Sequence, residues 1–280
     1  TYIDMVLNSG QYELESDFKY VWSENNKYGK EMIFALLHET GNNAAEIACH
    51  FGPSDHPEVP GRWQYYGVSL PFWRSYDKED PRREFFYYDY TGDAKRDDQS
   101  DYGFHYMVPE EGVTVVPNDT TKYMQNVATM KYTYDMISDA YYDGRTICIF
   151  RLSDVILCKA EIENNLNGPA AALPYLNQIR ARAGAPEYGK HNRFPAPSTK
   201  ETMNDAILKE RGYELVFEFQ RRADLIRFGK YEEVVNAHLK KLGIAQPTNV
   251  TSSLRYYPYP LNDAQLNPNL AAENPSRLPK

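Results

Sequence analysis

Three glutamates spaced four residues apart impose the strongest constraint on how this chain can fold. Glu210, Glu214 and Glu218 stand at i, i+4 and i+8, and Arg221 follows at i+11, so a continuous helix would present all four on one face. Carboxylates at this spacing repel one another and destabilise an isolated helix. The fold must therefore supply partners for them from outside their own helix.

Two interpretations of these carboxylates are open. Arg180 and Arg182, on the helix expected just before, are suitable cationic partners, and ion networks between packed helices are the commoner cause of such a pattern. Paired carboxylates can instead perform general acid–base catalysis, with Glu214 and Glu218 as the pair of a hydrolase. We expect the structural role and no enzymatic activity.

The second half of the chain is predicted to be helical. Apolar residues recur at helical spacing over residues 152–162 and 173–183, and Gly168-Pro169 between them combines a helix stop with a helix start. So short a link makes these two helices an antiparallel hairpin of the tetratricopeptide type. A third helix is predicted from Lys200 to Phe228.

The first half is acidic and rich in tyrosine. Residues 1–150 carry 25 acidic and 13 basic residues and 17 of the 24 tyrosines, whereas residues 151–280 carry 14 acidic and 18 basic residues. Residues 41–112 are rich in Gly, Pro, Asn and Asp and show little periodicity, so they are predicted to form long loops. Their aromatic content argues against disorder. Short strands are predicted at residues 31–37, 129–134 and 146–151.

We therefore divide the chain at residue 150. Residues 1–150 are expected to form a loop-rich aromatic ligand region, and residues 151–280 a helical scaffold that ends in a proline-rich tail. This tail, from Tyr256 to Lys280, is expected to be extended.

Composition and motifs exclude several functional classes. A net charge of -8 argues against a nucleic-acid-binding protein, because neutralising phosphates requires a basic surface. No apolar run approaches the roughly 20 residues of a transmembrane helix. Catalytic motifs such as G-x-S-x-G and H-E-x-x-H, and glycine-rich phosphate loops, do not occur in the sequence. Cys49, Cys148 and Cys158 cannot all pair, and we expect buried free thiols, with a single disulfide as the alternative.

The string from Glu210 to Phe228 resembles the signature of the SusD/RagB-like family, nutrient-binding lipoproteins of Gram-negative outer membranes, which reads ER..EL.FE..R..DL.R. Six further blocks resemble family patterns in the same order along the chain. They are residues 10–14, 31–34, 80–82, 150–161, 176–184 and 257–270. The departures are small: Gly212 lies inside the signature, and Ile226 stands where an arginine is common.

The resemblance implies a mainly α fold of tetratricopeptide-like helical hairpins (an α/α superhelix), with a loop-rich region and small β-hairpins. It also implies a non-catalytic protein on the outer surface of the cell outer membrane. Such a protein captures an oligosaccharide, or in some branches a peptide, and passes it to a SusC-like TonB-dependent transporter.

The N-terminal half of a typical member, with its lipid-bearing cysteine, is expected to be missing from this chain. An alternative stays open, in which this half mainly docks the transporter and the ligand site lies on the missing half.

The family signature blocks are structural, so ligand residues must be chosen by their chemistry. Sugars present apolar C–H faces and hydroxyl edges, which suit flat aromatic rings beside polar side chains. The best cluster lies between residues 61 and 76, with Asn43 upstream. The predicted ligand-binding residues are Arg62, Trp63, Tyr65, Tyr66, Trp73 and Asn43. In the alternative interpretation, Trp63 and Trp73 fill the core of a loop-rich subdomain.

A metal site is the remaining possibility, and no cofactor is expected. Asp93, Asp97, Asp98 and Asp101 cluster in one loop, and carboxylate oxygens suit calcium. Their spacing is not that of an EF-hand, so a solvated acidic loop is favoured. Cys49, His50, Asp55 and His56 could be drawn as a zinc site, but the sequence offers no second Cys or His pair for it.

Overall fold

The computed structural model describes residues 2–39, 46–59, 62–93, 103–112, 120–135, 144–243 and 250–269. The chain divides into two compact units, Thr1–Glu218 and Phe219–Lys280, and each is described by itself. The change in composition at residue 150 falls inside the first unit. There, strand β8 (Ile147–Arg151) runs directly into helix α4 (Leu152–Asn167).

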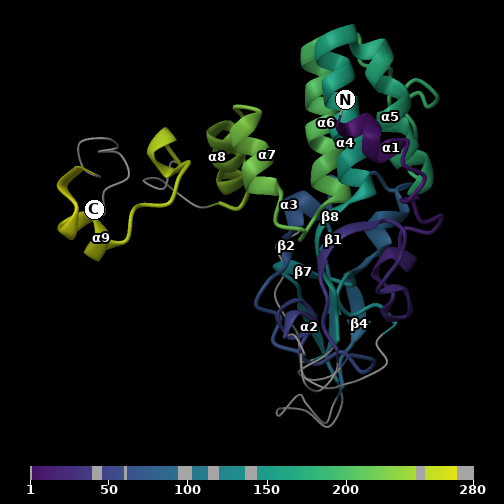
Figure 1. Ribbon diagram of the computed structural model, residues 1–280. Coiled ribbons are helices and arrows are strands. Elements are labelled where there is room, and N and C mark those ends of the chain that lie inside the picture. Colours follow the sequence, from purple (N-terminus) through teal and green to yellow (C-terminus); the bar gives the residue numbers. More distant parts are fainter. Residues whose placement is uncertain are drawn as a thin grey trace. The chain divides into compact units, whose positions relative to one another are not determined.

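Helix α4 and helix α5 (Pro169–Arg182) form the predicted hairpin of packed helices (Figure 1). Gly168 alone links them, and its φ of 89° lies in the left-handed region that favours glycine. Helix α6 (Lys200–Glu214) begins at Thr199, whose side chain caps the helix, and packs against both α4 and α5. The short helix α1 (Tyr2–Leu7) packs against α4. The mainly α, tetratricopeptide-like prediction is confirmed in this part of the chain.

Apolar side chains facing one another hold the three long helices together. Burying a large aliphatic side chain contributes about 1.5–3 kcal/mol, so this layer supplies much of the stability of the helical part. The fully buried members are Ile156 and Leu157 of α4, Leu176 and Ile179 of α5, and Met203 and Ile207 of α6.

The described residues of the loop-rich part of the first unit form three small sheets. Strands β1 (Met32–Leu36) and β8 pair antiparallel. A second sheet has the order β2-β7-β3, formed by Val68–Ser69, Asn126–Thr129 and Phe86–Tyr87. A third has the order β4-β5-β6, formed by Asp89–Thr91, His105–Met107 and Thr121–Tyr123.

Aromatic side chains fill the core beneath these sheets. One cluster contains Phe18 and Trp22, together with Phe51 of the short helix α2 (Ile47–Phe51). A second cluster contains Trp73, at the end of helix α3 (Leu70–Trp73). The tyrosine-rich first half thus uses many of its rings for packing.

Two predictions of secondary structure are wrong in extent. The third helix does not run to Phe228: α6 ends at Glu214, residues 215–219 form turns, and α7 (Arg221–Arg227) is a separate helix of the second unit. Phe217 and Phe219 have φ angles of 61° and 64°, which a right-handed helix cannot contain. The strand predicted at residues 129–134 is also wrong in extent. Strand β7 ends at Thr129, and residues 131–135 form a turn.

The strands predicted at residues 31–37 and 146–151 are confirmed as β1 and β8. In β1, Phe34 and Leu36 are 55% and 48% exposed. Phe34 pairs with Phe150 of β8, which is also exposed. One face of this two-stranded sheet is therefore apolar and open to solvent.

The second unit contains α7, α8 (Tyr231–Lys241), a single 3-10 turn at Ser252–Leu254, and α9 (Leu261–Leu266). The Arg222 guanidinium lies 5.1 Å from the ring of Tyr231 and 4.6 Å from that of Tyr257. Helix α9 interrupts the proline-rich tail, which was expected to be extended throughout.

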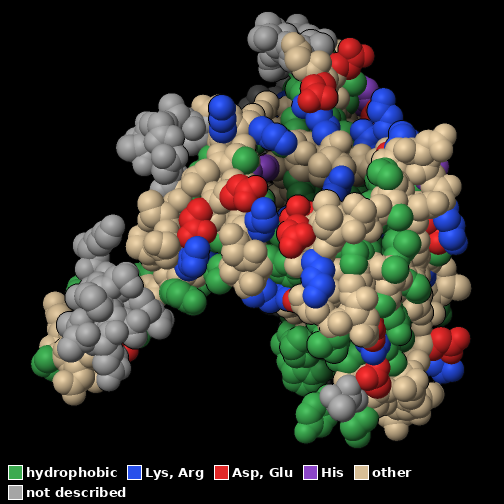
Figure 2. All heavy atoms as spheres, turned by 90° about the horizontal axis from the view of Figure 1, so that it is seen from above, with side chains coloured by type: hydrophobic (Ala, Val, Ile, Leu, Met, Phe, Trp, Pro, Cys, Tyr) green, Lys and Arg blue, Asp and Glu red, His purple; other side chains and the backbone are tan. Residues whose placement is uncertain are grey.

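Within the described ranges, no helix combines the length and apolar character needed to cross a bilayer. Lysine, arginine and acidic side chains are interspersed over the face shown in Figure 2, and no single basic area dominates it.

Candidate functional site

The carboxylates that constrain the sequence meet in a buried ion network of the first unit. Glu214 lies at its centre and is fully buried. Its carboxylate accepts hydrogen bonds from Arg82 Nη1 at 2.9 Å, from Arg151 Nη1 at 2.7 Å and from Arg182. Burial alone would raise the pKa of Glu214, but Arg182 and Arg151 hold it well below its ordinary range.

The two neighbouring glutamates are equally well paired. Glu210 accepts from Arg82 at 2.7 Å and from Arg180 at 2.6 Å. Glu218 lies in the turn after α6, yet it reaches the same network and accepts from Arg151 and Lys131, each at 2.6 Å. The partners that the sequence predicted, on the preceding helix, are therefore confirmed.

The sequence did not predict the five remaining members of the network, which are Glu31, Asp80, Arg82, Lys131 and Arg151. Four of them lie in the blocks that carry the family resemblance. Glu31 accepts from Arg151 at 2.6 Å and from Arg182 at 2.7 Å, and Asp80 pairs with Arg82 at 2.7 Å. The signal was the charged residue in each short block: Glu31 in residues 31–34, Asp80 and Arg82 in residues 80–82, and Arg151 in residues 150–161. Lys131 lies outside the blocks.

The network is formally neutral and closed to solvent. Five cationic and five anionic side chains, each at most 5% exposed, balance one another. They are Arg82, Lys131, Arg151, Arg180 and Arg182 with Glu31, Asp80, Glu210, Glu214 and Glu218. Their carboxylates are engaged by cations and have no access to a substrate, which removes the geometric basis for acid–base catalysis. The network ties the loops and strands to α5 and α6.

Exposed rings gather instead at helix α2. We call Trp63, Tyr65 and Tyr66 the aromatic surface; these side chains are 37%, 65% and 55% exposed. The rings of Trp63 and Tyr65 lie 5.5 Å apart at 35°, and the ring of His50 on α2 lies 5.2 Å and 5.5 Å from them. Tyr66 packs against Phe51 at 5.3 Å. Exposed rings in one place mark a binding surface more often than a packing accident.

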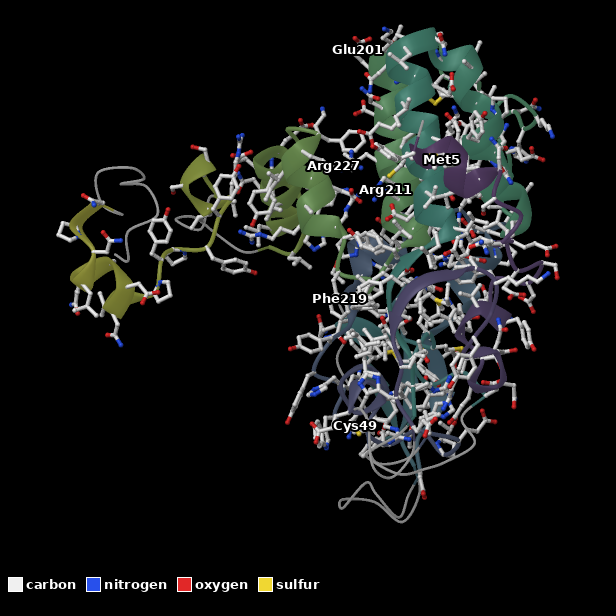
Figure 3. The ribbon with its side chains drawn as sticks, in the orientation of Figure 1. Met5, Cys49, Glu201, Arg211, Phe219 and Arg227 are labelled. Carbon is white, nitrogen blue, oxygen red and sulfur yellow. The ribbon has the colours of Figure 1, made fainter. Side chains whose placement is uncertain are left out.

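Backbone hydrogen bonds fix the aromatic surface to α2. The N–H groups of Trp63, Gln64 and Tyr66 donate to carbonyls of residues 49, 52 and 50 at 2.7, 3.0 and 3.1 Å. Gln64 has a φ of 48°, and its side chain donates to Asn126 at 3.4 Å. Figure 3 shows Cys49 of α2 at the end of the first unit away from α4, α5 and α6. The rings are thus held on a fixed backbone and not on a free loop.

Glycine permits the close approach of this segment to its neighbours. A Cβ atom on Gly52 would lie 2.7 Å from Arg62 Cγ, and one on Gly67 would lie 2.5 Å from Asn126 Oδ1. Both contacts are shorter than real Cβ atoms allow, so only glycine fits without a shift of the neighbour.

The other predicted ligand residues lie elsewhere. Trp73 is only 4% exposed: its indole N–H donates to the Arg83 carbonyl at 3.1 Å, so it packs the core and offers no stacking face. Arg62 is 2% exposed, and its Nη1 lies 3.6 Å from Cys49 Sγ. Asn43 lies outside the described residues. The alternative of core packing therefore applies to Trp73, while Trp63 is partly exposed.

The metal hypotheses gain no support from the described residues. Within them, no three His, Cys, Asp or Glu side chains are placed to hold a metal ion, which leaves the zinc proposal without a site. Of the acidic loop proposed for calcium, only Asp93 is described; Asp97, Asp98 and Asp101 lie outside the described residues. The three cysteines are free thiols, as expected, but only Cys49 and Cys148 are buried, and Cys158 is half-buried.

Comparison with known sequences gives consistent matches. The model of the SusD family matches residues 30–276. A SusD-like protein of Formosa agariphila is 39% identical over 120 residues, which cover 43% of this chain and 22% of that protein. The starch-binding protein SusD of Bacteroides thetaiotaomicron is 28% identical over 137 residues, which cover 48% of this chain and 22% of that protein.

Solved structures of similar proteins share the fold. Surface glycan-binding protein A from Bacteroides thetaiotaomicron, in complex with laminarihexaose, matches with a TM-score of 0.67 and 22% identity, over 95% of this chain and 56% of that one. A SusD homolog from the same organism matches with a TM-score of 0.68 and 24% identity, over 94% and 56%. The chain thus spans little more than half the length of these relatives.

Proposed function

Because the chain belongs to the SusD family, whose model matches residues 30–276, we propose that its aromatic surface binds oligosaccharide nutrients without catalysis. One observation carries the proposal: Trp63, Tyr65 and Tyr66 expose their rings side by side on a backbone fixed to α2. The C–H faces of a sugar ring pack on such rings, while the hydroxyl edges find polar neighbours such as Gln64. Preorganised rings lose little conformational entropy on binding.

The names of relatives support the same ligand class. One matched protein is called starch-binding, and one matched structure holds laminarihexaose, a glucan oligosaccharide. The burial of Glu214 and Glu218 within the ion network supports a binding role over hydrolysis, because neither carboxylate meets solvent.

The wider role that we propose rests on family membership. The complete protein is attached to the outer membrane by an N-terminal lipid, is exposed at the cell surface, and takes part in polysaccharide utilisation. It delivers its ligand to a SusC-like TonB-dependent transporter.

Isothermal titration calorimetry with a panel of oligosaccharides and peptides tests this proposal. We expect an oligosaccharide to bind, and Trp63→Ala and Tyr66→Ala each to weaken it about 30-fold, the equivalent of about 2 kcal/mol for a central aromatic contact. Tyr28→Ala is the matched control, since Tyr28 is 72% exposed but lies outside the aromatic surface. Binding of peptides and no sugars would favour the peptide-binding branch of the family instead.

A second candidate function, docking of the transporter, has its own observation. The face of the β1–β8 sheet exposes Phe34, Leu36 and Phe150, and an exposed apolar face suits a protein partner. In that case the ligand contacts lie on a part of the protein outside this chain. Unchanged ligand affinity in folded Trp63→Ala and Tyr66→Ala variants of the complete protein would favour it.

A further inference from the structure

The sequence around the aromatic surface is acidic. Between His38 and Ser69 it contains four acidic residues, Glu39, Glu46, Asp55 and Glu58, and a single lysine or arginine, Arg62. Proteins that recognise carboxylate or sulfate groups commonly use arginine, whose planar guanidinium donates two parallel hydrogen bonds. Arg62 is therefore the only side chain of this type that residues 38–69 could offer to an anionic ligand.

Arg62 is held beneath the surface and cannot reach a ligand. Its side chain is buried, and its Nη1 lies 3.6 Å from the sulfur of Cys49 on α2. Its Cγ packs so closely on Gly52 that a Cβ there would lie 2.7 Å away. Residues 38–69 therefore contribute no exposed lysine or arginine to the site.

An acidic side chain instead lies next to His50, whose ring packs against the aromatic surface. Glu46, at the start of α2, has a side chain that is 38% exposed, and its Oε2 lies 3.9 Å from His50 Nε2. The His50 ring in turn contacts the rings of Trp63 and Tyr65 at 5.2 and 5.5 Å. A sugar ring stacked on Trp63 or Tyr65 would therefore lie near His50, and the Glu46 carboxylate is the acidic group next to that imidazole. A carboxylate there repels an anionic ligand, and the repulsion weakens in salt.

On the basis of the proposed function, we propose that the aromatic surface selects uncharged oligosaccharides and disfavours those that carry uronic acid or sulfate groups. Stacking and hydrogen bonding are available to both classes. Only the anionic class is repelled by the Glu46 carboxylate, and residues 38–69 offer it no exposed lysine or arginine in compensation.

Calorimetric titration of the chain with two hexasaccharides of equal length tests the selectivity. One probe is a neutral glucan and the other a polymer of uronic acid, each at about 20 mM and 300 mM salt to span strong and weak screening. We expect the uronate to bind about tenfold more weakly at low salt, with the difference shrinking at high salt. Glu46→Gln should narrow the ratio of the two dissociation constants about threefold, the equivalent of about 0.7 kcal/mol. Glu13→Gln, which removes an exposed carboxylate remote in sequence, should leave the ratio unchanged.

The outcomes separate this inference from the proposed function. Uronate binding that is as tight as glucan binding, and is lost in Trp63→Ala, would overturn the charge selectivity and leave the aromatic site standing. A ratio that Glu46→Gln does not change would also overturn it. If neither hexasaccharide binds, or if Trp63→Ala leaves the affinity unchanged, the proposed function is wrong. The charge selectivity, which rests on it, is then wrong as well.

Discussion

Replacing Glu214 by glutamine should lower the free energy of unfolding of the first unit by about 3–5 kcal/mol, because it breaks a buried ion network from one side. The Glu214 carboxylate accepts hydrogen bonds from three arginines and has no exposed surface. Glutamine has nearly the same shape, so no cavity forms. It carries no charge, however, and its amide N–H₂ group would face guanidinium donors.

The remaining contacts decide where in that range the loss should fall. Arg82 keeps Asp80 at 2.7 Å, and Arg151 keeps Glu218 at 2.6 Å. Arg182 keeps Glu31 at 2.7 Å. Since none of the three guanidinium groups is left without a carboxylate, we expect the lower end, about 3 kcal/mol. A domain of this size loses roughly 2–4 °C of melting temperature per kcal/mol, so the transition should move down by about 10 °C.

Urea unfolding followed by tryptophan fluorescence measures this loss selectively. Trp22, Trp63 and Trp73, the three tryptophans of the chain, all lie in the first unit. Glu13→Gln is the control: its carboxylate is 72% exposed, pairs with Lys30 at 3.2 Å, and should change stability by less than about 1 kcal/mol. A Glu214→Gln protein within about 1 kcal/mol of the parent would refute the reasoning, because the network would then contribute no more than a surface pair.

Three further changes test other parts of the account. The folded-state pKa values of Glu214 and Glu218 lie below the ordinary 4.5. The stability that these carboxylates contribute is therefore present above pH 4.5 and is lost as the pH falls below it. The loss is at most about 1.4 kcal/mol per pH unit for each group. Acid titration of stability should accordingly be shallower in Glu214→Gln. Gly52→Ala should destabilise the first unit by about 2 kcal/mol, since its Cβ would lie 2.7 Å from Arg62 Cγ; an unchanged urea midpoint would contradict the close packing. Tyr76→Phe should cost about 1–2 kcal/mol in the same assay, because the buried hydroxyl donates to the Tyr213 carbonyl at 3.0 Å, and a loss below about 0.5 kcal/mol would contradict this.

Local signals explain which elements were predictable. The boundary of α4 and α5 at Gly168-Pro169 follows from glycine and proline chemistry alone, and the structure places both helix ends there. The end of α6 at Glu214 carries no such signal. Residues 215–219 contain neither proline nor glycine, and the left-handed φ of Phe217 depends on tertiary packing of its ring against Phe51.

The ion network was predicted only in part for a similar reason. Helical spacing identified Glu210 and Glu214 and their partners on α5, because those contacts lie between sequential helices. Arg82 and Arg151 approach from loops and a strand more than 60 residues before Glu214, a distance over which periodicity carries no information. The family blocks do carry that information, and the family they indicated is confirmed by the match over residues 30–276.

Aromatic residues show the limit most clearly. Trp63 and Trp73 lie ten residues apart in the same kind of sequence, yet one is 37% and the other 4% exposed. Composition alone does not distinguish the two residues. Tertiary packing does: Trp73 lies in a buried cluster, and its indole N–H donates to the Arg83 carbonyl. The prediction of Trp63, Tyr65 and Tyr66 as ligand residues therefore stays a proposal, now restricted to the rings that reach solvent.

The most direct test of the central claim is a crystal structure of the chain grown with a neutral glucan hexasaccharide. The account predicts sugar rings packed on Trp63, Tyr65 and Tyr66, with carbon atoms within about 4.5 Å of the aromatic faces. A hexasaccharide bound elsewhere on the chain, with these three rings bare, would contradict it.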